Sequence, residues 1–196
     1  MKKYILCLLP FFLVLIACSS QASDQSKESK AATTSQELVT TTEVTTEAVV
    51  EEPEKVEVYQ YEVVEENVKQ IVKEILNYKG DKFLKMGLHI TQEADEATKA
   101  NFVGFDFATV KTELLAYLEE QNFTNQLRAV PGLELATDVS PDYSIIMHIK
   151  IDMATIDLQA LSNVEGVGAD FTDLDSVTPS AYILGLKLRG AVKVSE

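Results

Sequence analysis

The chain has 196 residues, of which 17 are basic and 31 acidic, and its formal net charge is −14 at pH 7. Nucleic acids and anionic membrane surfaces attract basic patches, so this charge argues against both as partners. Removal of residues 1–17 would take two lysines and no acid, leaving a net charge of −16.

The first residues resemble the signal of a bacterial lipoprotein. Two lysines precede an apolar run, 4–16, that is shorter than the roughly 20 residues of a membrane-spanning helix. Leu15-Ile16-Ala17-Cys18 then resembles a lipobox, whose cysteine is lipidated and becomes the mature N-terminus. The resemblance implies a signal peptide at 1–17 and an anchor of palmitate-type acyl chains on Cys18. An ordinary secreted protein, or an uncleaved anchor, is the alternative.

The mature domain is expected to contain no cysteine. Cys7 would leave with the signal peptide, and Cys18 would carry the lipid. This excludes a disulfide, a thiolate nucleophile and a cysteine metal site, so the exported domain must be stabilised by its hydrophobic core.

Residues 18–58 differ in composition from the rest of the chain. After Cys18 they are dense in Ser, Thr, Glu and Ala, contain neither glycine nor an aromatic residue, and repeat Thr-Thr-Glu twice. Such a segment buries too little apolar surface to offset its ordering entropy, which predicts a disordered tether. A long tether favours a Gram-positive cell surface. We expect residues 59–196 to form one domain.

The first segment of that domain has two interpretations. Apolar residues across 64–76 have helical spacing, which favours a helix. The turn signal at 77–81 and the alternation from Leu84 to Ile90 instead favour a hairpin.

Helices and strands are then expected in alternation. Asp106 can cap a helix that runs to about Gln121, where Asn122 can end it. Strands follow at Leu133–Val139 and over Tyr143–Met153, whose alternation predicts one core face and one wet face.

Two further helices are expected near the C-terminus. The first is short and covers Asp157–Asn163. The second begins after Thr178, with Pro179 at its first position and Gly190 just past its end. Tyr182 and the leucines after it alternate as in a strand, but the capping residues favour the helix.

Several short motifs together resemble those of the YehR-like bacterial lipoproteins. They are Tyr78-Lys79-Gly80-Asp81-Lys82, Val130-Pro131-Gly132, Ile151-Asp152-Met153 and Ile156-Asp157-Leu158-Gln159-Ala160-Leu161. The resemblance implies an α+β fold, an antiparallel sheet with two or three helices packed on one face. It also implies a strand at 67–77. The family offers no established activity and no catalytic residues to carry over, and this chain departs from it in the long acidic tether.

Two sets of side chains are candidates for metal binding. His89 and His148 would each lie on the polar face of a strand and could meet if the strands were neighbours, but zinc needs four filled positions. Asp170, Asp173 and Asp175 crowd one loop, as oxygen ligands of calcium do, although an acidic loop before a helix is commoner.

Other candidates have commoner structural interpretations. Asp152 and Asp157 could form an acid–base pair, but a strand end and a helix start are the commoner places for them. Tyrosines at 59, 61, 78 and 143 could line a binding face, but tyrosines in strands normally pack.

The sequence favours a non-catalytic binding module. We expect it on the exported side of the bacterial cell membrane, with no cofactor, and with a surface protein, wall component or small ligand as its partner. The alternative is an envelope enzyme or metal-dependent accessory factor that uses the aspartate loop or the two histidines.

Overall fold

A computed structural model describes residues 52–65, 68–165, 167 and 174–195. These residues form an antiparallel sheet of six strands in the order β4-β5-β3-β2-β1-β6, with helices packed against it, so the fold class is α+β as predicted. The strands are β1 Lys55–Glu65, β2 Val68–Lys79, β3 Lys82–Gln92, β4 Leu133–Val139, β5 Ile145–Asp152 and β6 Val192–Val194.

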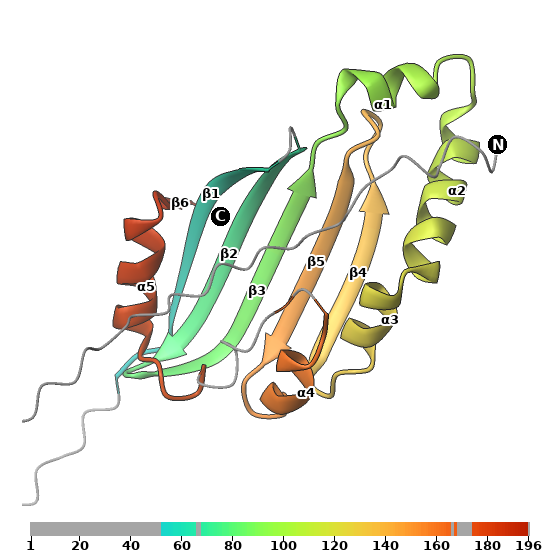
Figure 1. Ribbon diagram of the computed structural model, residues 1–196. Helices are drawn as coiled ribbons and strands as arrows, with labels where there is room; N and C mark the ends of the chain where they lie inside the picture. The colour runs from blue at the N-terminus through green and yellow to red at the C-terminus, as the bar shows by residue number, and fades with distance from the viewer. Residues whose placement is uncertain (1–51, 66–67, 166, 168–173, 196) are drawn as a thin grey trace, which may run out of the picture.

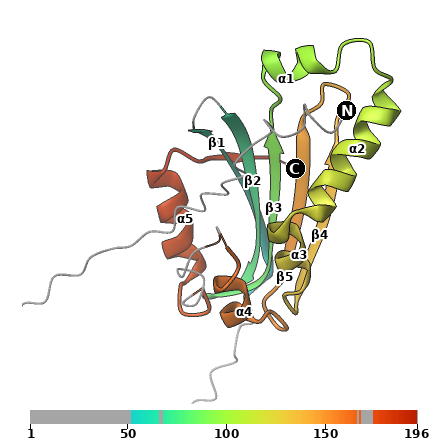
Figure 2. The same cartoon turned by 45° about the vertical axis from the view of Figure 1, so that its right-hand side comes forward.

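The helices are α1 Glu96–Asn101, α2 Phe107–Glu120, α3 Asn122–Arg128, α4 Leu158–Ser162 and α5 Pro179–Leu188. In both ribbon views α5 lies at the β1–β6 end of the sheet, and α2 and α3 lie at the β4 end (Figure 1, Figure 2). Within the described part of the chain, no helix is long and apolar enough to span a bilayer.

Alternation in the central strands puts the apolar side chains on one face of the sheet, here called the core face. It consists of the even-numbered residues of β2, Phe83 and the even-numbered residues of β3 from Met86 onward, and the odd-numbered residues of β4 and β5. Leu76, Ile90 and Met147 on this face are almost free of solvent and share one cluster with Leu127 of α3 and Leu186 of α5. Helices α2, α3, α4 and α5 therefore pack on the core face.

Residues 68–77 belong to strand β2, so the helical interpretation of the spacing in this segment is wrong. β2 pairs with β1 on one side and with β3 on the other, and the β2–β3 hairpin turns at Gly80. Ile71 and Ile75 lie on the face opposite the core. These apolar residues interrupt the period of two that is expected for a strand, and they give the segment the apolar spacing of a helix.

The predicted helix caps are present. The side chains of Asp106, Asp157 and Thr178 accept hydrogen bonds from backbone N–H groups in the first turns of α2, α4 and α5. Pro179 is the first residue of α5, which excludes the strand alternative for Tyr182–Leu188.

Several features differ from the expectation. β1 begins at Lys55, inside the range 18–58 that we expected to be tether. The short helices α1 and α3 were not expected, and α3 starts at Asn122, where the preceding helix was expected to end. Six or seven residues carry too little periodic signal to identify a helix.

Gly132 closes a tight turn between α3 and β4. Its φ is +79°, and its carbonyl accepts a hydrogen bond from the Asp152 backbone N–H at 3.0 Å. A Cβ at this position would lie 2.4 Å from the backbone nitrogen of Ile156. The close approach of two backbones therefore requires glycine here, which gives the Val130-Pro131-Gly132 motif a structural reason.

A Gly132→Ala substitution should lower the free energy of unfolding by about 3 kcal/mol, because it combines a left-handed backbone with a backbone clash. Urea unfolding of the full chain measures this loss. Gly104→Ala is the matched control, since Gly104 has φ +87° and nothing within 4 Å of its added Cβ. It should cost only about 1 kcal/mol. Equal losses in the two variants would contradict the proposed clash.

One carboxylate interrupts the apolar core face. Glu74 of β2 is only 2% exposed. Its Oε1 accepts a hydrogen bond from the Tyr61 hydroxyl at 2.9 Å, and its Oε2 accepts one from the Tyr182 hydroxyl at 2.7 Å. Burial raises the pKa of both tyrosines, so both remain protonated donors. Glu74 thereby connects β1, β2 and α5.

A Tyr182→Phe substitution should destabilise the chain by about 1–3 kcal/mol, because one oxygen of a buried carboxylate loses its donor. Thermal unfolding measures the effect. Tyr143→Phe serves as the control, since no hydrogen bond of the Tyr143 hydroxyl is present among the described residues. A Tyr182→Phe chain as stable as this control would mean that Glu74 needs no bond from α5.

Candidate functional site

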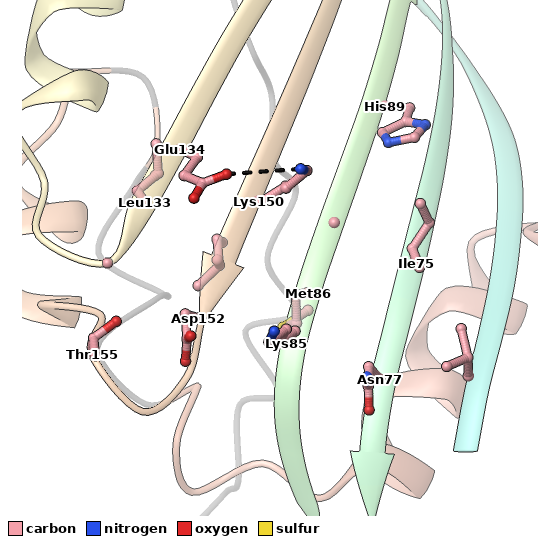
Figure 3. Close-up of a pocket in the computed structure, with 14 residues that line it drawn as sticks. Ile75, Asn77, Lys85, Met86, His89, Leu133, Glu134, Lys150, Asp152 and Thr155 are labelled. Carbon is pink, nitrogen blue, oxygen red and sulfur yellow. Dashed lines mark ion pairs between the residues drawn. The ribbon is translucent and has the colours of Figure 1, made fainter. Parts of the chain in front are cut away.

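The second face of the sheet, here called the open face, bears the odd-numbered residues of β2, the odd-numbered residues of β3 from Lys85 onward, and the even-numbered residues of β4 and β5. Among the described residues, no helix joins a core cluster on this side. A hollow of about 620 Å³ lies here, above β2, β3 and β5 (Figure 3). Residues that line it include Ile75, Lys85, Gly87, His89, Lys150 and Asp152.

Gly87 lines the hollow, and it places no side chain in the middle of β3. It lies opposite Ile75 of β2 and Lys150 of β5. A Cβ added to Gly87 would come within 3.3 Å of the Ile75 Cβ. Glycine weakens a strand interior and often marks a place where a ligand or another backbone approaches closely.

The walls of the hollow carry charges of both signs. Lys150 extends toward Glu134 of β4, with Nζ and Oε2 3.8 Å apart (Figure 3). Both side chains are mostly exposed, at 69% and 80%, so this ion pair contributes little stability. Lys85 and Asp152 occupy paired positions on β3 and β5 at the lower end of the hollow.

His89 and His148 meet at the upper edge of the hollow, as the sequence suggested they could. They are paired residues of β3 and β5, and their ring centroids are 4.2 Å apart. Lys73 of β2 lies opposite His89 on its other side. Burial lowers the pKa of His89, and the nearby His148, Lys73 and Lys150 lower it further.

The aspartate loop cannot be compared with the expectation as a set, because Asp170 and Asp173 lie outside the described residues. Asp175 is exposed, as is Glu165. Within the described ranges, no three His, Cys, Asp or Glu side chains are grouped closely enough to hold a metal ion. Cys18 also lies outside the described residues.

The remaining candidates have structural roles. Asp157 caps α4, and Asp152 accepts a hydrogen bond from the Ala154 N–H in the turn after β5. Tyr59 and Tyr78 are buried in the core cluster, which Tyr61 contacts, while Tyr143 packs on Phe102 and Phe107. These tyrosines form no joint binding face.

Sequence reasoning missed Gly87 and the lysines of the open face. One signal was present: a glycine stands inside the alternating run from Leu84 to Ile90. The lysines gave no such signal, because single lysines on the solvent-facing side of a strand are common.

Comparison with known proteins supports the fold. A protein from Streptococcus pneumoniae TIGR4, solved by NMR, superimposes with a TM-score of 0.60 at 15% sequence identity, over 88% of this chain and all of that one. The NMR structure of the E. coli YehR protein matches with a TM-score of 0.51 at 21% identity, over 73% of this chain and 92% of that one. The fold is therefore YehR-like. No protein-family model and no curated protein matches the chain.

The His89 environment predicts a loss of stability in mild acid. Below the ordinary histidine pKa of 6.5, the unfolded chain takes up a proton that folded His89 binds only at lower pH. The unfolded state then holds more protons, so the free energy of unfolding falls as the pH falls through this window. Urea unfolding at about pH 7.5 and about pH 5.5 measures the change.

A His89→Gln variant should lose less stability between these two pH values than the natural chain. The exposed acids Asp95 and Asp138 have pKa values lowered from 3.8, so they titrate below this window and do not obscure the result. An unchanged pH dependence in the variant would exclude His89 as its source.

Proposed function

We propose that this chain is a lipid-anchored binding protein of the bacterial cell surface that holds a small polar ligand in the hollow around Gly87. The observation that carries the proposal is the hollow itself, which lies on a sheet face without a covering helix among the described residues. Its lining combines apolar and charged side chains of both signs, as ligand sites do. A rigid central part of a sheet positions these groups.

The lipobox-like Leu15-Ile16-Ala17-Cys18 supports the anchor, and the YehR-like fold agrees with the lipoprotein family that the sequence resembles. In this proposal acyl chains on Cys18 hold the protein at the exported side of the membrane, most simply at a Gram-positive surface. The acidic segment up to the start of β1 would separate the domain from the bilayer.

A Cys18→Ser substitution should move the chain from the membrane fraction to the soluble fraction and abolish incorporation of a labelled palmitate analogue. Cell fractionation and in-gel detection of the label measure both effects. Cys7→Ser is the matched control and should change neither. Continued labelling of Cys18→Ser would contradict the anchor.

Binding in the hollow can be tested by NMR on the full chain in a nonionic detergent. Glycerol 3-phosphate, N-acetylglucosamine, alanine and a muramyl peptide are added singly, and at least one should shift the amide signals of Gly87 and its neighbours. Lys85→Glu, which changes the hollow, should remove the shifts. Lys82→Glu, an equal charge change in the exposed hairpin, should keep them. Failure of all four compounds, or shifts confined to the helices, would contradict the proposal.

The alternative is a metal-dependent accessory factor or an envelope enzyme. The contact between His89 and His148 favours the metal-dependent form, because two imidazoles at paired strand positions can share one ion. The histidine pair lacks a third protein ligand among the described residues.

A further inference from the structure

We propose that Lys73, His89, His148 and Lys150 form a binding site for a small phosphate-type anion on the open face of the sheet. This inference rests on the proposed ligand-binding function and names the chemical class of the ligand. It follows from the strand register, the distribution of charge and the space left by Gly87.

The register places the four side chains side by side. Lys73 of β2 pairs with His89 of β3, and His89 pairs with His148 of β5, so the three form one row across neighbouring strands. Adjacent strands lie about 4.8 Å apart, so the row spans about 10 Å. Lys150 follows His148 on the same face and extends over the hollow (Figure 3).

Gly87 gives an anion access to this row. It occupies the position beside His89 on the same face of β3 and directly opposite Lys150. Because it has no side chain, an oxyanion can approach the imidazole of His89 and the ammonium group of Lys150 together from the hollow.

The acids of the neighbouring strand offset the charge of this cluster only in part. Asp138 of β4 is bound to Lys111 of α2, with an Oδ1–Nζ distance of 2.6 Å. Glu134 is 3.8 Å from Lys150 in an exposed pair. Lys73 has no ion-pair partner within the described ranges. In a chain of net charge −14, these four basic groups are thus compensated only in part, by Glu134 and Asp138.

These charges favour an anion over a metal ion. Lys73 and Lys150 would repel a divalent cation held by the two imidazoles, whereas they attract an oxyanion. A phosphate group has several acceptor oxygens and about two negative charges, which suits several N–H donors. The net charge of the whole chain opposes an extended anionic surface, so the ligand is expected to be small and soluble.

Binding should strengthen as the pH falls. An anion stabilises the protonated form of His89, so its affinity rises when His89 takes up a proton. The other charged groups facing this cluster are Lys73 of β2, Lys150 of β5, and Glu134 and Asp138 of β4. The pKa of Asp138 is lowered from 3.8, so Asp138 titrates below this range. Sulfate does not titrate here, whereas the second pKa of phosphate is about 6. A pH dependence of sulfate binding therefore comes from the protein and not from the ligand.

The test titrates the full chain, purified in a nonionic detergent, with sodium sulfate and with glycerol 3-phosphate at about pH 5.5 and about pH 7.5. Calorimetry measures affinity, and NMR follows the histidine ring signals. We expect tighter binding at the lower pH and a higher titration midpoint for His89 with sulfate present. Lys73→Gln should weaken binding by at least about tenfold, whereas the control Lys82→Gln should leave it unchanged.

Other outcomes would overturn the inference. If neither anion binds at either pH, or if Lys73→Gln binds as the natural chain does, the site is not an anion site. Zinc binding that is lost in His89→Asn and His148→Asn, without anion binding, would assign the pair to a metal instead. Binding to phosphatidylglycerol vesicles but not to soluble anions would assign it to lipid headgroups.

The two proposals fail in different ways. If alanine or N-acetylglucosamine shifts the Gly87 amide while sulfate and glycerol 3-phosphate do not, the binding function stands and the anionic class is wrong. If no compound shifts any amide of the hollow, both are wrong.

Discussion

The fold depends on the one-sided distribution of apolar side chains in the three central strands. In β2, β3 and β5 nearly every second residue is a large apolar group on the core face, and the helices cover that face. Burial of this face supplies the main stabilising free energy. The opposite face is then released from the need to pack, so it can carry histidines, lysines and a glycine without loss of the core. The candidate site and the core therefore lie on opposite faces of one sheet, and both follow from the alternation of side chains along its strands.

This arrangement explains how far the sequence could predict the fold. Helix ends with local chemical signals were predictable, because Asp106, Asp157 and Thr178 need only the amides of their own first turns. Strand β2 could not be predicted from periodicity, because Ile71 and Ile75 place apolar groups on the open face as well. Its pattern therefore satisfies helical and strand periodicity at once, and only pairing with β1 and β3 decides between them.

The site was less predictable, since it depends on long-range pairing. β5 lies between β3 and β4, so the partner of His89 comes from a strand far along the chain. No local pattern predicts this order. Periodicity could place each histidine on a wet face, but their contact requires the register. The importance of Gly87 likewise appears only when Ile75 and Lys150 are known to lie opposite it.

Register also links the stability of the core to the geometry of the site. A slip of one residue between β3 and β5 would move His89 or His148 to the core face and expose the apolar residues beside it. The free-energy cost of exposing Leu88, Ile90, Met147 and Ile149 therefore holds the two histidines opposite each other. The core, and not an attraction between the two imidazoles, therefore fixes their separation. In the proposed site, an anion bound between them would offset the repulsion that arises when His89 takes up a proton.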